Sequence, residues 1–118
     1  MVSRTVDGRT IVDVTGEVDV YTAPTLREKL SSLVDAGHID LVVNLTEVRF
    51  MDSTGLHALI QYAVAPEMRG RLTVTNGSPQ VRRLFQVSGV GRYLSFASPP
   101  RTPLRVIAGQ GSTTRAPR

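Results

Sequence analysis

The stretch "IDLVVNL", residues 39–45, limits more than any other segment what this chain can fold into. It is an almost unbroken run of apolar residues, which is typical of a strand buried on both faces of a sheet. Strands of this kind belong to sheets that helices cover. The run therefore predicts an α/β domain in which helices flank a central sheet.

The segments ahead of this run predict two strands and a helix. Residues 2–6 and the alternating stretch "RTIVDVTGEVD" have strand character, and Asp7-Gly8 between them is a hairpin signal. The period then changes to that of a helix, with Thr22 as its cap, Pro24 in its first turn and Gly37 as its stop.

The segments after the run continue the alternation. An apolar stripe with helical spacing begins at Ser53, and Pro66 should kink or end that helix. The stretch "RLTVT" predicts a strand, residues 78–89 a capped helix with a glycine stop, and residues 94–97 an edge strand. Parallel crossovers together with the hairpin give a mixed central β-sheet.

Length and charge divide the chain in two. We expect one domain over residues 1–98 and a basic, disordered tail over residues 99–118, with residues 104–107 packing against the domain. The net charge of +4 lies entirely in the tail, because residues 1–100 hold ten basic and ten acidic side chains. The charge therefore does not predict direct binding to nucleic acid.

Several classes of function are not expected. The chain has no cysteine and only two histidines, so no metal site is predicted. It also lacks a glycine-rich phosphate-binding loop, so no cofactor is expected. Neither a signal sequence nor a membrane span is evident. We expect a cytoplasmic protein without a cofactor and without a membrane contact.

The stretch "MDSTGL" holds the most informative chemistry, because it places hydroxyls beside a carboxylate where a helix begins. In the simplest interpretation the Ser53 hydroxyl caps the helix, which stabilises it by about 1 kcal/mol. The alternative is that Ser53 is displayed for phosphorylation. A helix N-terminus tolerates a phosphate, since its dipole and free N–H groups favour negative charge.

Two enzymatic interpretations of the same region are weaker. Ser53 could be a nucleophile with His57 as its base, but the G-x-S-x-G pattern is incomplete and no third residue orients the histidine. Asp19 and Asp52 could form a carboxylate pair, although capping or solvated carboxylates are far commoner. The sequence therefore favours a protein that is not an enzyme.

Three stretches together, "TGEVDVYTAPTLREKL", "LVVNLTEVRFMDSTGL" and "SPQVRRLFQVSGV", resemble the bacterial anti-sigma factor antagonist family, the STAS domain. The resemblance implies the STAS-type fold and partner switching. The unphosphorylated protein would bind an anti-sigma factor that is also a serine kinase, and so release a sigma factor that regulates transcription, as in a stress response. Phosphorylation would end binding, and a PP2C-type phosphatase would reset the switch.

The resemblance also assigns site residues by position. The phosphorylated residue would be Ser53, beside Asp52. The partner-binding residues it implies are Asp19, Thr22, Asp52, Ser53, Thr54, Gly55 and His57.

The helix after Ser53 departs from the family pattern, because its outward positions carry little charge. The residues expected to point outward are His57, Ala58, Gln61, Tyr62 and Ala65. This face could bind a partner, be covered by the tail, or mediate a homodimer. Two other functions stay open for a STAS domain: a scaffold subunit of a larger signalling complex, and a nucleotide-binding protein.

Overall fold

The computed structural model describes residues 1–38, 40–65 and 71–97. It contains a five-stranded sheet in the order β1-β2-β3-β4-β5, in which β1 is antiparallel to β2 and the later pairs are parallel. The expected mixed sheet with flanking helices is confirmed. The elements are β1 (Val2–Val6), β2 (Arg9–Val18), α1 (Ala23–Asp35), β3 (Leu41–Met51), α2 (Ser53–Ala63), β4 (Leu72–Val74), α3 (Pro79–Ser88), the short 3-10 helix η2 (Val90–Arg92) and β5 (Ser95–Phe96).

The β1–β2 hairpin forms where the sequence predicts it. Asp7 and Gly8 both have positive φ, 52° and 81°, as a two-residue hairpin turn requires. The turn sets the register, in which Val6 lies opposite Arg9.

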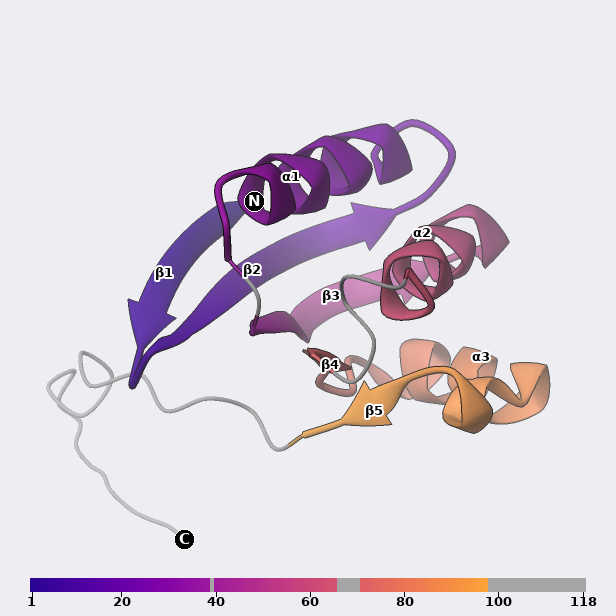
Figure 1. Cartoon of the computed structure of the whole chain (residues 1–118). Coiled ribbons are helices and arrows are strands. Elements are labelled where there is room, and N and C mark those ends of the chain that lie inside the picture. Colours follow the sequence, from indigo (N-terminus) through magenta and orange to yellow (C-terminus); the bar gives the residue numbers. More distant parts are fainter. Residues whose placement is uncertain (39, 66–70, 98–118) are drawn as a thin grey trace, which may run out of the picture.

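The helices follow one another in step with the parallel strands, from α1 at the top of Figure 1 to α3 at the lower right. Each crossover moves one strand further along the sheet in the same direction, so right-handed connections place the helices on one face. Alternate residues of β2 and β3 pack against that layer in a single core. Its fully buried members include Val12, Val14, Leu26, Leu30, Val43, Leu45 and Leu59.

Helix α2 buries more of its surface than the sequence suggests. Ala58 is fully buried, and Tyr62 is half-buried with its hydroxyl donating to the Arg27 carbonyl oxygen at 3.1 Å. The expectation that these two residues point outward is therefore wrong, because α1 packs along this side of α2. Ala65 likewise packs against the core, whereas His57 and Gln61 are exposed as expected.

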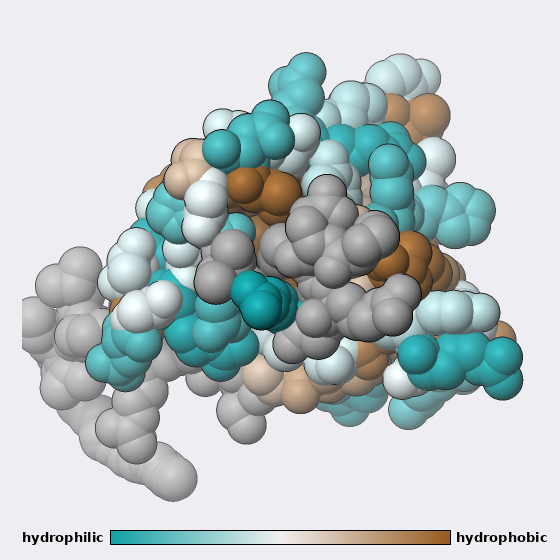
Figure 2. Space-filling model, in the orientation of Figure 1, coloured by the Kyte–Doolittle hydropathy of each residue, from teal (hydrophilic) through white to brown (hydrophobic). Residues whose placement is uncertain are grey.

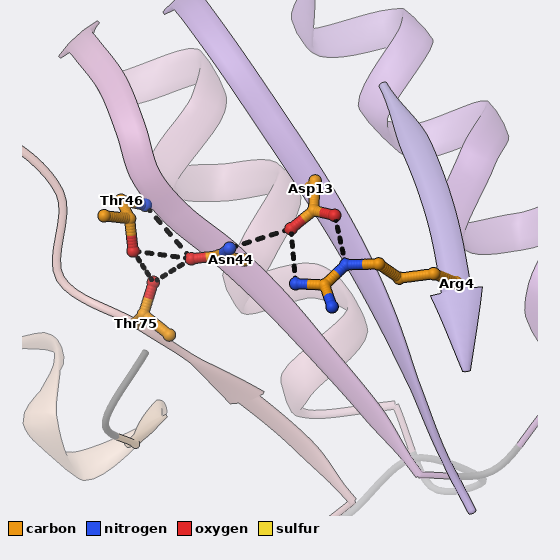
Figure 3. Close-up of polar contacts among 5 residues, drawn as sticks. All are labelled: Arg4, Asp13, Asn44, Thr46 and Thr75. Atoms are coloured by element: carbon orange, nitrogen blue, oxygen red, sulfur yellow. Dashed lines mark hydrogen bonds and ion pairs between the residues drawn. The ribbon is translucent and has the colours of Figure 1, made fainter. Parts of the chain in front are cut away.

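The face of the sheet that no described helix covers carries a chain of polar contacts across four neighbouring segments (Figure 3). Arg4 Nε donates to Asp13 Oδ2 at 2.6 Å, and Asn44 Nδ2 donates to Asp13 Oδ1 at 2.7 Å. The fully buried Thr75 donates to Asn44 Oδ1 at 3.0 Å and accepts the N–H of Leu45 at 2.8 Å. The Thr75 bonds satisfy buried polar groups at the point where the chain leaves β4.

Some of the expected features involve residues that the structure does not describe. Pro66, the tail over residues 99–118 and its segment 104–107 lie outside the described residues; α2 itself ends at Ala63. Within the described part of the chain, no helix is long and apolar enough to cross a membrane.

Candidate functional site

The candidate site lies at the carboxyl ends of β2 and β3, where α1 and α2 begin. Both strands run toward the right of Figure 1, and both helices start at that end. Val18 pairs with Met51, and the Val18 carbonyl oxygen accepts the N–H of Asp52 at 3.1 Å. The loop containing Asp19 and the start of α2 at Ser53 therefore leave the sheet from adjacent positions, which is where open α/β folds commonly bind ligands.

Asp52, and not Ser53, caps helix α2. Its backbone is extended, with φ −106° and ψ −173°, and Oδ1 accepts the N–H groups of Thr54 at 2.9 Å and Gly55 at 3.3 Å. The Thr54 hydroxyl also donates to this oxygen. The bond from the Thr54 hydroxyl, followed by those from the two backbone N–H groups, lowers the pKa of Asp52. The interpretation of Ser53 as the cap is therefore wrong.

Ser53 occupies the first helical position with an exposed side chain. Its hydroxyl makes no hydrogen bond to any described residue, in contrast to that of Thr54. Because Asp52 already holds the start of the helix, a group added to the Ser53 oxygen displaces no capping bond. Ser53 is therefore an exposed hydroxyl at the start of α2 that takes no part in the cap.

The cap predicts a pH-dependent contribution to stability. Asp52→Ala should lower the free energy of unfolding by about 1 kcal/mol at neutral pH. The folded-state pKa lies below the unfolded one, so the contribution is present above the unfolded pKa of about 4 and is lost as pH falls through the folded pKa. Urea denaturation at neutral pH and at a pH below the folded-state pKa of Asp52 would measure this contribution.

The matched control is Asp52→Asn, which keeps the accepting oxygen but cannot titrate. Its stability relative to wild type should change little at neutral pH. If the stability difference between Asp52→Ala and wild type became larger at acid pH, the assignment of Asp52 as the cap would be contradicted.

Asp19 organises the loop between β2 and α1. Its Oδ1 accepts the N–H groups of Tyr21 at 3.0 Å and Thr22 at 3.1 Å. Thr22 occupies the cap position of α1, but its hydroxyl makes no capping bond; it accepts the N–H of Asp19 at 2.9 Å and donates to the Glu17 carbonyl oxygen at 2.8 Å. The expectation that the Thr22 side chain caps this helix is therefore wrong, and both side chains instead fix the loop.

Three exposed apolar side chains at this end of the molecule were missed in the sequence. Val20 and Tyr21 are 57% and 85% exposed on the β2–α1 loop, and Phe50 is 42% exposed near the end of β3. Figure 2 shows strongly apolar atoms at the upper right, where Figure 1 places that loop. One sequence signal could have indicated them. Val20 and Tyr21 directly follow a turn-forming aspartate, where the fold does not require apolar residues.

Gln80, from the first turn of α3, is a second residue that the sequence did not reveal. Its Oε1 accepts the N–H of Met51 at 2.9 Å, and its Nε2 donates to the Met51 carbonyl oxygen at 3.0 Å. The side chain thus replaces a strand partner at the last residue of β3, directly before Asp52. No local pattern announces such a contact, because the two residues lie 29 positions apart.

The geometry gives the enzymatic interpretations no support. His57 is exposed, and within the described chain no hydrogen bond joins it to Ser53. Asp19 and Asp52 each accept bonds from their own loop and do not share a hydrogen bond. Among the residues described, no group of three or more acidic or histidine side chains could hold a metal ion.

Comparison with known proteins agrees with this architecture. The STAS domain family model matches residues 1–102. An anti-sigma-B factor antagonist of Bacillus subtilis is 41% identical over 80 residues, 67% of this chain and 72% of that protein.

Two solved structures extend the comparison to the fold. An anti-sigma factor antagonist from Mycobacterium paratuberculosis superposes with a TM-score of 0.72 at 27% identity, covering 93% of this chain and 92% of that one. The phosphorylated form of the Bacillus cell fate determinant SpoIIAA superposes with a TM-score of 0.60 at 25% identity, covering 90% and 95%. The chain belongs to the STAS domain family and, within it, to the anti-sigma factor antagonists.

Proposed function

We propose that this protein switches partners through Ser53. With Ser53 unmodified it binds an anti-sigma factor and thereby releases a sigma factor. The anti-sigma factor acts as the serine kinase, phosphorylation of Ser53 ends the complex, and a PP2C-type phosphatase restores it. The protein is itself a regulatory binding module and not an enzyme.

The observation that carries this proposal is the contrast between the two neighbouring hydroxyls. Ser53 is exposed and free of hydrogen bonds to described residues, whereas the Thr54 hydroxyl is half-buried and bonded to Asp52. Phosphorylating Thr54 would break a bond of the helix cap, and phosphorylating Ser53 would break none. The phosphorylated form of SpoIIAA supports the idea that this fold accepts such a group.

The surroundings of Ser53 suit a partner surface that a phosphate can disrupt. The side chains of Val20, Tyr21 and Phe50 are apolar and exposed. Burying them under a partner would stabilise the complex. A phosphate on Ser53 adds about −1.5 to −2 charge next to the ionised Asp52. Covering two adjacent anionic groups with a partner costs desolvation and repulsion, so the phosphorylated surface should release it.

The direct test is site-mapping mass spectrometry of the protein isolated from its native cells, with the sigma factor active and inactive. We expect one phosphate on Ser53, more abundant when the sigma factor is inactive, and none in Ser53→Ala. Thr54→Ser is the control, because it keeps both hydroxyls and should leave the phosphate on Ser53.

Two outcomes would contradict the proposal. A phosphate mapped to residue 54 in the wild-type protein would show that the free hydroxyl is not the acceptor. The absence of phosphate in both states of the sigma factor would show that binding is not switched at Ser53.

A further inference from the structure

The charges of the folded part are unevenly divided along the chain. Residues 71–97 contain four arginines, Arg71, Arg82, Arg83 and Arg92, and no acidic residue. In residues 1–65 acidic side chains outnumber basic ones. The near-neutral total of the domain conceals this division. Arg82, Arg83 and Arg92 are all exposed, so the α3–η2–β5 end has a cationic surface. The strongly hydrophilic region over α3 is visible at the lower right of Figure 2.

This cationic end contains a pocket of about 330 Å³. Phe85 and Phe96 form its apolar part, with ring centroids 5.4 Å apart and planes inclined by 52°. Polar side chains at its edge include Asn76, Arg82 and Gln86. An apolar floor with a few polar groups and one cation at the edge suits an apolar side chain that lies next to a carboxylate.

The pocket lies beside the last strand of the described sheet. β5 pairs with β4 on one side, and no described strand pairs with its outer edge. Phe96 belongs to β5 and is 41% exposed. An open strand edge can pair with an extended peptide, whose main chain supplies hydrogen bonds while its side chains enter adjacent pockets.

We propose that the α3–η2–β5 end is a second binding site, which takes an extended acidic segment of a partner protein. The segment adds to the outer edge of β5, packs an apolar side chain against the accessible ring of Phe96, and places carboxylates against Arg82 and Arg92. This site is separate from the Ser53 surface and stands independently of the partner switch.

The geometry favours a peptide over a nucleic acid. Binding a nucleic-acid backbone requires basic side chains along a track of several phosphates. Arg82 is the one arginine that lines this pocket among the described residues. Phe85 is only 4% exposed, so the pocket offers one accessible ring and not a series of stacking platforms.

The test uses fluorescence anisotropy with a labelled peptide in which a central phenylalanine is flanked by two glutamates on each side. We expect saturable binding that weakens with added salt. Arg82→Glu should weaken it by about tenfold, through repulsion at the pocket edge. Arg83→Glu, the same charge change on the next residue of α3, should have a smaller effect because Arg83 does not line the pocket.

Further variants and probes distinguish this site from the Ser53 surface and from a nucleic-acid site. Phe96→Ala should weaken binding, whereas Ser53→Asp should leave it unchanged, so failure here is distinguishable from failure of the partner switch. Thermal unfolding of each variant checks its fold. The proposal is overturned if the peptide does not bind, if a version with lysines in place of glutamates binds equally well, or if an oligothymidylate probe binds more tightly than the peptide.

Discussion

Ser53→Asp should weaken binding of the cognate anti-sigma factor by about a hundredfold, whereas Ser53→Ala should bind like wild type. The aspartate adds a second carboxylate beside Asp52, at an exposed position at the same end of the molecule as the exposed apolar side chains Val20 and Tyr21. Alanine removes a hydroxyl that makes no hydrogen bond to the described residues and leaves the Asp52 cap intact. Isothermal titration with the purified partner measures both affinities.

A matched control separates the position of the charge from its sign. Ser32→Asp adds the same charge at an exposed serine near the far end of α1, away from the mouth of α2. Its affinity should stay within about twofold of wild type. Equal weakening by the two aspartate variants would mean that net charge controls binding, and equal affinity of all variants would refute the switch.

Gly55→Val should lower the free energy of unfolding by about 3 kcal/mol, which is a typical cost of overpacking a rigid site. A Cβ atom at Gly55 would lie 2.6 Å from Val18 Cγ1 and 2.9 Å from Met51 Cγ. Both neighbours are fully buried at the ends of the strands that carry the candidate site. Helix α2 can approach the sheet this closely only because residue 55 has no side chain. Urea denaturation measures the loss.

Two further variants identify the cause of that loss. Gly91→Val is the control, because a Cβ there meets no atom within 4 Å, and it should change stability by less than about 0.5 kcal/mol. Val18→Ala removes the nearest clashing atom, so combining it with Gly55→Val should cost less than the sum of the two single changes. Strict additivity would show that the Gly55–Val18 contact is not responsible.

The net charge of the domain does not show how its charges are distributed over the surface. The sequence indicated a neutral domain with a basic tail, which did not predict direct binding to nucleic acid. The structure places Arg82 and Arg92 near β5 and most carboxylates elsewhere, so the domain has a cationic end despite its balance. Charge acts over roughly a Debye length of about 10 Å, and only the fold decides which charges lie that close.

The order and type of the elements were determined by the sequence, because their signals are local. The Asp7-Gly8 turn, the periodicity of the helices, and the glycine stops at Gly37 and Gly89 act over a few residues and do not need a partner segment. The tertiary structure alone decided which of two adjacent polar residues caps α2. Both Asp52 and Ser53 suit a cap, and the bond from Asp52 N–H to the Val18 carbonyl oxygen holds Asp52 in the extended conformation that a cap requires.

The same reason accounts for the other differences. Ala58 and Tyr62 are covered because α1 packs against α2, and Gln80 reaches Met51 because α3 begins beside the end of β3. Each of these contacts joins segments far apart in the chain. Periodicity reports which residues share a face of a helix, but only the packed structure determines which neighbour that face meets.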